Sequence, residues 1–381
     1  MLKYNKIKNT CTGCFACYNI CPTNAISMRL NKEGFLYPEI DKEKCINCGL
    51  CEKVCPVLNK IKNNNLKPKI VFAAKSKNQL IQKNSSSGGI FSELANYILD
   101  RKGVVFGVTF KNNKTKHICI KNKDELEKIR GSKYLQSYIN YSFKDVEKNL
   151  VDKKDVLFSG TPCQISGLKE YLKLRKTDDQ NLFLIDVVCH GVPSYKIFKE
   201  YLKNEFGGNT RIKNINFRYK KESWDNYYIT YYFDKGKEIS NNYKRDYFFR
   251  GYLKNFYLRK SCYNCNLARI PRQGDITLGD FWGIKKEYYD SQGISLILIN
   301  NKKGKNLINK IIKLIEIEEL DIIEASKGNP RLINGKYDSI KEREQFFIDY
   351  FANGFVFVKK KYLKSKTTQL IILKIKKLLG Y

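Results

Sequence analysis

The chain has 381 residues, 42% of them hydrophobic, and its 71 Lys and Arg against 38 Asp and Glu give a formal net charge of +33. The length leaves room for one large domain or two ordinary ones with a packed core. The basic residues are mostly lysine with no arginine cluster, which argues against a nucleic-acid partner because arginine dominates the reading of base edges. Only two histidines are present, so histidine-rich metal sites are excluded.

The N-terminal segment repeats one cysteine pattern, C-x2-C-x2-C-x3-C-P, at Cys11, Cys14, Cys17 and Cys21 and again at Cys45, Cys48, Cys51 and Cys55. This is the spacing of bacterial two-cluster ferredoxins, in which the fourth cysteine of each run binds the other cluster. The pattern therefore predicts two [4Fe-4S] clusters with crossed ligands, one on Cys11, Cys14, Cys17 and Cys55 and one on Cys45, Cys48, Cys51 and Cys21. A zinc site would use two pairs of ligands, and a disulfide framework would need an oxidising compartment and usually a short secreted chain.

After this module, short apolar segments alternate with segments of helical periodicity. Strands are predicted over residues 70–74, 104–110, 156–158, 182–188, 227–233 and, as the last strand, 293–299. Helices are predicted over residues 90–99, from the loop at 160–164 to about residue 174, after residue 194, and in a charged tail from about residue 311. This alternation predicts an α/β fold with a mixed sheet, in which ligands bind at the carboxyl ends of strands.

A run of small residues precedes the helix predicted at 90–99, namely Ser85, Ser86, Ser87, Gly88 and Gly89. Small residues let a backbone approach a ligand closely, and the first N–H groups of a helix attract anions. The run therefore predicts a phosphate-binding loop, although it is not a G-x-G-x-x-G motif. The alternative is an ordinary serine N-cap with a glycine turn.

Four motifs follow in the remaining sequence: Gly-Thr-Pro-Cys-Gln at 160–164, Cys189-His190-Gly191, the pair Cys262 and Cys265, and Gly-Asp-Phe-Trp-Gly at 279–283. Together they resemble the beta subunit of coenzyme F-420-reducing hydrogenases and dehydrogenases. The resemblance covers about residues 70–320, and the cysteine-rich module ahead of it matches fused members of that family. It implies an iron–sulfur flavoprotein that holds FAD and at least one further [4Fe-4S] cluster.

The resemblance also divides the chain. Residues 1–58 are expected to form the two-cluster ferredoxin-type module and residues 59–68 a linker. Residues 69–150 and 151–320 are expected to form the two parts of the α/β flavin- and cluster-binding domain, and residues 321–381 a helical, basic tail. The site at the strand ends of residues 70–200 is where FAD is expected.

Five cysteines lie beyond residue 58, and all except Cys119 are either set in a Gly/Pro loop or close to another cysteine. With the resemblance, this setting predicts a third [4Fe-4S] cluster on Cys163, Cys189, Cys262 and Cys265, since a cubane needs four thiolates. On spacing alone a zinc ion fits equally well. Alternatively, Cys262 and Cys265 form a redox dithiol that reduces disulfides. Cys119 is interpreted as structural.

Three more residues are candidates for the flavin site. Lys133 is expected to stabilise negative charge on a reduced flavin, or else to be a solvated lysine. His190 is a candidate proton donor, with a hydrogen bond to the cluster thiolates as the preferred alternative. Asp280 either contacts flavin or substrate, or caps the glycine-rich turn.

Together these features predict a cytoplasmic oxidoreductase, with no signal peptide or membrane-spanning helix. Electrons are expected to enter the N-terminal clusters from a ferredoxin or another redox protein, cross the third cluster to FAD and leave as a pair. The alternative is a non-catalytic electron-transfer subunit of a larger oxidoreductase complex. Residues 359–381 are predicted to form an amphipathic helix, for weak contact with an anionic membrane surface or, preferably, for docking on protein.

Overall fold

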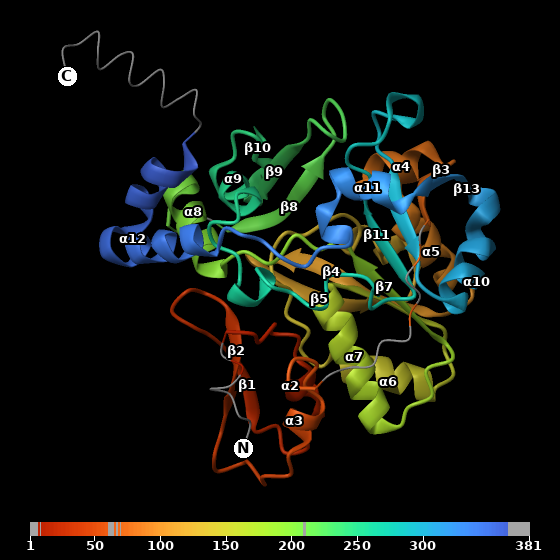
Figure 1. The fold of residues 1–381 in the computed structure, drawn as a ribbon, viewed down its shortest axis with the longest axis horizontal. Helices are drawn as coiled ribbons and strands as arrows, with labels where there is room; N and C mark the ends of the chain where they lie inside the picture. The colour runs from red at the N-terminus through yellow and green to blue at the C-terminus, as the bar shows by residue number, and fades with distance from the viewer. Residues whose placement is uncertain are drawn as a thin grey trace.

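The computed structural model describes residues 7, 9–59, 65, 68, 70–208 and 211–364. They form an N-terminal module, a large sheet covered by helices, and a lobe built on a small sheet (Figure 1). In the module, the antiparallel strands β1 (Ile26–Leu30) and β2 (Leu36–Ile40) accompany two short helices, α2 (Ala16–Ile20) and α3 (Leu50–Lys53). Each helix follows a left-handed residue directly after the second cysteine of its run, Phe15 (φ 67°) and Gly49 (φ 72°), so the two runs fold alike.

Eight strands form the large sheet, in the order β13-β3-β12-β11-β7-β6-β4-β5. The central strands are parallel: β4 (Val104–Lys111), β6 (Val156–Gly160), β7 (Leu182–Val187) and β11 (Ile276–Asp280). The flanking strands pair antiparallel: β5 (Lys114–Ile120) on one side and β12 (Ser295–Ile299), β3 (Ile70–Ser76) and β13 (Ile315–Asp321) on the other. Parallel neighbours end at a common edge, so the loops after β6, β7 and β11 meet there.

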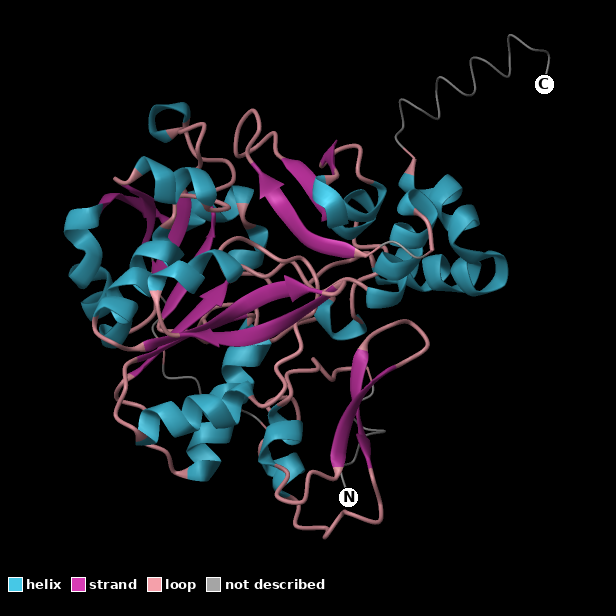
Figure 2. Ribbon diagram, turned by 180° about the vertical axis from the view of Figure 1, so that it is seen from behind, coloured by secondary structure: helices cyan, strands magenta, loops and turns pink. Residues whose placement is uncertain are grey.

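Successive residues of the central strands point to opposite faces of the sheet, and each face has its own helices (Figure 2). Val105 and Leu157 face α5 (Ile90–Asp100) and α10 (Lys302–Ile311). Phe106 and Phe158 face α6 (Ser142–Val151) and α7 (Pro162–Arg175), and this core also includes Phe15, Ala16 and Ile20 of the N-terminal module. The module is therefore packed onto the large domain through α2 and α7.

The lobe contains the three-stranded sheet β10-β9-β8 and an aromatic core. Its strands are β8 (Ile212–Tyr219), β9 (Tyr228–Phe233) and β10 (Glu238–Asn242), and its helices are α8 (Tyr195–Phe206), α9 (Tyr247–Leu253) and α12 (Ile340–Val358). Phe35 and Tyr37 of the module's hairpin belong to the same core. The module thus contacts both the lobe and the large sheet.

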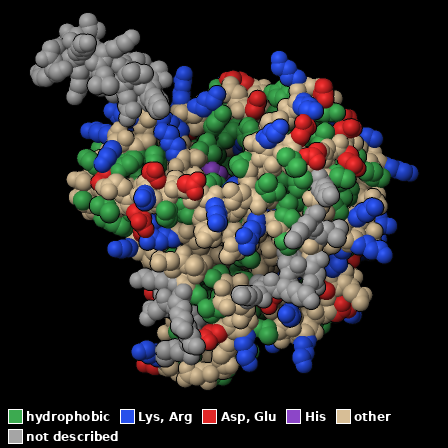
Figure 3. Space-filling model, viewed as in Figure 1, with side chains coloured by type: hydrophobic (Ala, Val, Ile, Leu, Met, Phe, Trp, Pro, Cys, Tyr) green, Lys and Arg blue, Asp and Glu red, His purple; other side chains and the backbone are tan. Residues whose placement is uncertain are grey.

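The remaining helical elements are α4 (Gln79–Asn84), α11 (Ile322–Gly328), and the short turns η1 (Lys123–Lys128), η2 (Asp234–Gly236), η3 (Lys260–Cys262), η4 (Lys286–Tyr288), η5 (Ile312–Leu314), η6 (Pro330–Leu332) and η7 (Lys359–Leu363). None of the helices described here is long and apolar enough to cross a membrane. Figure 3 shows Lys and Arg side chains scattered over the visible face, not gathered in one patch.

The predicted fold class, a ferredoxin-like module followed by an α/β domain with a mixed sheet, is confirmed. Two details of the prediction are wrong. The strand at 293–299 is not the last, because β13 follows inside the segment predicted as a helical tail. The edge strand β5 and the central strand β11 were not predicted at all. Most of the predicted linker and the predicted amphipathic helix beyond residue 364 lie outside the described residues.

Candidate functional site

A cavity of about 310 Å³ opens where β6, β7 and β11 end, and its wall includes residues that directly follow these strands, such as Thr161 and Val188. The first turn of α5 and the loop 129–137 complete the wall. Its volume lies in the range of small-molecule sites. Nearly all the sequence-predicted residues of the large domain meet here: Ser85, Ser86, Ser87, Gly89, Lys133, Cys163, Cys189, His190, Cys262, Cys265 and Asp280.

The four cysteines predicted for a third cluster line this one cavity. Cys163 lies in the first turn of α7, Cys189 follows β7 after one residue, and Cys262 and Cys265 come from η3 and the loop behind it. Burial, followed by the neighbouring Cys189 and Cys265 thiolates, raises the pKa of Cys262 to about 12. Burial and the Cys265 thiolate likewise raise the pKa of Cys163 well above its usual value.

The eight N-terminal cysteines separate into the two crossed groups that the spacing predicts. Cys21 lines a small cavity with Cys45, Cys48 and Cys51. Cys14 is instead next to Cys55 and Cys11, and burial with those two thiolates raises its pKa to about 12. Cys17 shares the same neighbours. The structure therefore places the last cysteine of each run with the first three of the other, and their role as cluster ligands stays a prediction.

The three cysteine groups follow one another from the surface to the cavity. Cys48 of the outer group is exposed, whereas Cys11 and Cys14 are buried. Cys51 of the outer group interacts electrostatically with Cys17 of the middle group, and Cys14 of the middle group does so with Cys163. Thr12, from the loop of the middle group, itself lines the cavity.

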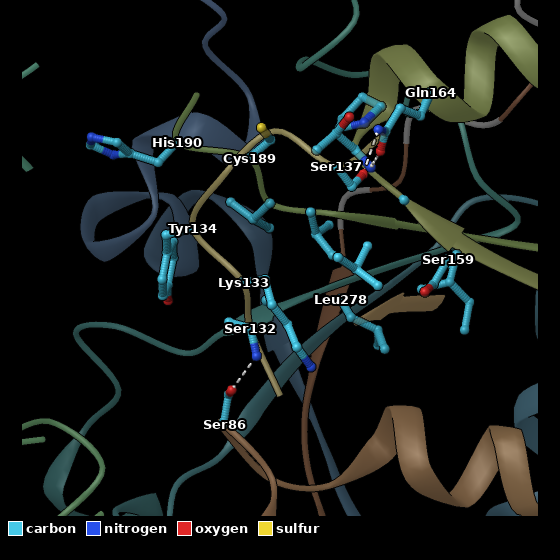
Figure 4. Close-up of a pocket in the computed structure, with 18 of the residues that line it drawn as sticks. Ser86, Ser132, Lys133, Tyr134, Ser137, Ser159, Gln164, Cys189, His190 and Leu278 are labelled. Carbon is cyan, nitrogen blue, oxygen red and sulfur yellow. Dashed lines mark hydrogen bonds between the residues drawn. The ribbon is translucent and has the colours of Figure 1, made fainter. Parts of the chain in front are cut away.

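The serine-rich loop offers its backbone to the cavity, because its hydroxyls bind protein groups. Ser85 Oγ donates to the Ile81 carbonyl (2.7 Å), Ser87 Oγ donates to the Ile294 carbonyl (2.7 Å), and Ser86 Oγ accepts from the Ser132 N–H (2.8 Å; Figure 4). Helix α5 begins after Gly89 (φ 90°) without a side-chain cap. Such an open helix N-terminus fits an anionic group.

Gly88 does not line the cavity, which corrects its assignment as a ligand contact. Its N–H donates to Ser295 Oγ (3.0 Å), and its carbonyl accepts from the Ser76 N–H (2.7 Å). A Cβ at this position would stand only 2.3 Å from the Ala74 carbonyl oxygen. Gly88 is therefore needed where the loop passes close to β3.

Lys133 extends from its loop into the space between Ser86 and Leu278 (Figure 4). Its Nζ donates to the carbonyls of Arg130 and Gly131, the latter at 3.1 Å. Desolvation lowers the pKa of this amine to about 7. Lys133 is thus half-buried and not a solvated surface lysine. A negative group in the cavity would favour the protonated, cationic form of its amine.

His190 makes neither of the interactions predicted for it. Its Nε2–H donates to the Tyr252 carbonyl (3.2 Å), and the Tyr337 hydroxyl lies 3.0 Å from Nδ1. Desolvation lowers the pKa of the imidazole to about 4, so it is neutral at physiological pH. The ring points away from Lys133 and Ser86 (Figure 4). With both nitrogens occupied, it neither presents a proton to the cavity nor hydrogen-bonds a cysteine sulfur.

Asp280 forms a buried ion pair with Arg218 (3.1 Å) at the wall of the cavity. The Arg218 guanidinium lies 3.8 Å above the Tyr227 ring and 5.1 Å from that of Trp282. Asp280 therefore bridges the lobe and the large sheet in addition to lining the cavity.

Two arginines that hold the cysteine loops were not predicted from the sequence. Arg331 donates to the carbonyls of Cys189 (3.2 Å) and Cys262 (3.3 Å) and so fixes two cysteine loops. Arg259 reaches from η3 to the first cysteine loop, where its Nε–H donates to the Cys11 carbonyl (2.7 Å). Neither lies in a motif, and burial distinguishes them from the many surface basic residues only once the fold is known.

Among the described residues, no three His, Cys, Asp or Glu side chains converge closely enough to share one metal ion. In a cubane each thiolate binds a different iron, so its four sulfurs need not meet at one ion.

Comparisons with known proteins agree with this organisation. Residues 71–142 and 153–324 match the N-terminal and C-terminal models of "Coenzyme F420 hydrogenase/dehydrogenase, beta subunit", and residues 10–59 match "4Fe-4S dicluster domain". A solved chain of the F420-reducing [NiFe] hydrogenase complex from Methanosarcina barkeri is 17% identical, with a TM-score of 0.47 over 74% of this chain and 92% of that one.

Curated relatives include one of the subunits of the F(420)H(2) dehydrogenase of Methanosarcina mazei, which is 23% identical over 51% of this chain and 59% of its own length. The beta subunit of the F420-dependent formate dehydrogenase of Methanocaldococcus jannaschii is 26% identical over 70% of both chains. The match therefore spans only part of the first relative. Because the two models of one family together cover residues 71–142 and 153–324, the chain belongs to the family of coenzyme F420 hydrogenase/dehydrogenase beta subunits.

Proposed function

We propose that the protein relays electrons between a one-electron carrier and a two-electron acceptor, through three [4Fe-4S] clusters and FAD. Family membership supports the broader part of this function, an electron-transferring iron–sulfur oxidoreductase subunit. The observation that supports the finer part of the proposal is that one ligand-sized cavity is lined by Cys163, Cys189, Cys262 and Cys265. A cluster there would stand between the N-terminal clusters and any ligand of the cavity.

The residues of the cavity fit FAD in two respects. The uncapped N-terminus of α5 and the backbone of 85–87 suit a pyrophosphate. Lys133, with its lowered pKa, would take up a proton beside a negatively charged ring. When bound, FAD would supply the conversion between single electrons and an electron pair.

The disulfide reductase alternative is disfavoured by the state of the cysteines. A nucleophilic cysteine needs a lowered pKa and an electropositive setting, whereas burial and two nearby thiolates raise the pKa of Cys262 to about 12. Iron would replace the proton and compensate the buried negative charge. We therefore assign Cys262 and Cys265 to the third cluster and not to a free dithiol.

The donor and acceptor follow from chemistry and from the relatives. A ferredoxin or another one-electron protein would deliver electrons at the exposed Cys48. Two relatives are named as subunits of F420-dependent or F(420)H(2) dehydrogenases, so we propose a larger complex as the working unit and coenzyme F420 as the first acceptor to assay. We place this chemistry in the cytoplasm, where thiolate-bound clusters stay reduced.

The test is anaerobic purification of the wild type and of a Cys262→Ala, Cys265→Ala double variant, with iron and released flavin measured in both. We expect the double variant to lose about a third of its iron, since each of three clusters holds four irons. Cys119→Ala is the matched control, because Cys119 lies outside all three groups, and it should keep full iron. Zinc in place of iron, or unchanged iron in the double variant, would contradict the third cluster. Absence of flavin from the wild type would contradict FAD.

A further inference from the structure

Three arginines, Arg259, Arg272 and Arg343, have fully buried side chains (0% exposed). A buried guanidinium is costly unless a countercharge compensates it. Arg272 has such a partner in Asp186 (3.4 Å), and Arg343 has one in Glu33. Within the described part of the chain, Arg259 alone among the three lacks a carboxylate at ion-pair distance.

The neighbours of Arg259 are neutral groups and one sulfur. Its Nε–H and Nη2–H donate to the carbonyls of Cys11 (2.7 Å) and Leu36 (2.7 Å), and Nη1–H donates to Gln136 Oε1 (3.1 Å). Nη2 also lies 3.8 Å from Cys11 Sγ. The Tyr37 ring covers the guanidinium at 4.2 Å. Among these described side-chain contacts, the sulfur of Cys11 is the atom that becomes anionic when it binds iron, and the charge of Arg259 also acts more weakly on the Cys262 thiol of the inner group.

The backbone of Arg259 is tied to the third cysteine group. Its carbonyl accepts from the Cys262 N–H (2.9 Å), and its N–H donates to the Val192 carbonyl (2.9 Å). One residue thus contacts the middle group through its side chain and the inner group through its backbone. Gln136 reinforces this link, because its amide donates to the carbonyls of Thr12 (3.3 Å) and Gly13 (3.1 Å).

We propose that Arg259 is a positioning and redox-tuning residue for the cluster on Cys11, Cys14, Cys17 and Cys55. This inference rests on the proposed function, because it requires that cluster. Four thiolates outweigh the positive charge of a cubane core, so the centre is anionic and gains a further negative charge on reduction. A fixed cation and an N–H···S hydrogen bond stabilise the reduced form and raise the reduction potential.

The consequence concerns direction within the relay. Of the two N-terminal groups, the outer one is exposed at Cys48, and the middle one faces Arg259. An electron arriving at the outer cluster therefore moves to the middle cluster, because the reduced state is stabilised there. The transfer involves one electron per cluster and no proton.

The experiment is an EPR-monitored redox titration of the anaerobically purified full chain, comparing wild type, Arg259→Gln and Arg259→Lys. The middle cluster's signal is the one missing from a Cys14→Ala variant. We expect Arg259→Gln to disfavour reduction of this cluster by at least tenfold, which corresponds to about 59 mV for one electron. Arg259→Lys should shift the potential of this cluster less, because lysine keeps the positive charge but lacks the planar set of guanidinium N–H donors. The inner cluster should shift less, because only its Cys262 interacts with the Arg259 charge, and the outer cluster should shift least.

The matched control is the double variant Glu33→Gln, Arg343→Gln, which removes an equally buried arginine without changing net charge. We expect its middle cluster to keep the wild-type potential. If the Gln variant instead loses about a third of its iron while the control keeps its iron, Arg259 is the countercharge of that cluster. Full iron with an unchanged potential, or equal iron loss in the control, would show that Arg259 is only structural. Absence of clusters from the wild type would overturn the proposed function itself.

Discussion

At the scale of single residues, burial decides the protonation of both histidines. His117 stacks on Phe158 with ring centroids 5.0 Å apart, and its Nε2–H donates to the Ser159 carbonyl (3.0 Å). The Ser137 hydroxyl, 3.0 Å away, can then donate to Nδ1. Desolvation lowers the pKa of His117 to about 4, as it does for His190. Two neutral imidazoles thus serve as structural connectors near the cavity.

This state of His117 predicts a stability loss in acid. Between pH 6.5 and about 4, His117 is protonated in the unfolded chain but stays neutral in the folded one. The free energy of unfolding therefore falls as the pH drops through this window. The full loss is on the order of 3 kcal/mol. We expect His117→Gln to have a lower Tm than wild type at pH 7.5 but a smaller further decrease at pH 5.5. Anaerobic thermal melts at both pH values measure this, and equal decreases in the two proteins would contradict it.

At the scale of elements, the start of α7 is held by one amide. Gln164 Oε1 accepts from the Thr161 N–H (3.0 Å), and its Nε2–H donates to Ser137 Oγ (2.9 Å). Thr161 and Gln164 together form a capping box. The first turn of α7 carries Cys163, so this cap connects the position of a cysteine to His117 through Ser137.

Removing this cap should therefore affect both stability and the proposed third cluster. We expect Gln164→Leu to cost about 1–3 kcal/mol, because it leaves buried polar partners unpaired. It should also speed iron loss to a chelator from one of the three clusters. Gln345→Leu is the control, since Gln345 lies exposed on α12 and, within the described ranges, its side chain bonds only Asp349 (3.0 Å). Wild-type melting and iron retention in Gln164→Leu would refute the role assigned to the cap.

The elements that could be predicted from the sequence are those whose own residues indicate them without knowledge of a partner. The strands β4, β6 and β7 are continuous apolar runs buried on both faces, so they stand out without a partner. β5 and β13 lie at the sheet edges. β5 begins with four polar residues and β13 alternates Ile with Glu, so neither is a continuous apolar run, and pairing with β4 and β3 makes them strands. The cysteines were found because thiol spacing is rare. Arg259 and Arg218 were not, because burial alone separates them from the rest of the 71 Lys and Arg residues.

At the scale of the whole molecule, the cysteine groups differ in solvent access: Cys48 of the outer group is exposed, whereas every cysteine of the other two groups is half-buried or buried. The outer group includes the exposed Cys48 and lies in a loop whose Ile46 side chain is 64% exposed. The middle group lies between α2, the hairpin and α7, with Cys11 and Cys14 each 8% exposed. The inner group lies behind it, on the wall of the cavity. The N-terminal module is therefore packed against the large domain, with its middle cysteine group in the contact.

This difference predicts which of the proposed clusters decays first. An oxidant or chelator reaches an exposed thiolate first, and local opening of a packed core is slower than attack at the surface. On brief exposure of the holoprotein to air with a ferrous chelator, we expect about a third of the iron to appear in a fast phase, because one of the three proposed clusters has an exposed cysteine. A Cys48→Ala variant should lack that fast phase, whereas Cys163→Ala, which removes a ligand of the inner group, should retain it. Release of all the iron in a single phase would show that the three groups are equally accessible and that the packing of the module against α7 does not protect the inner path.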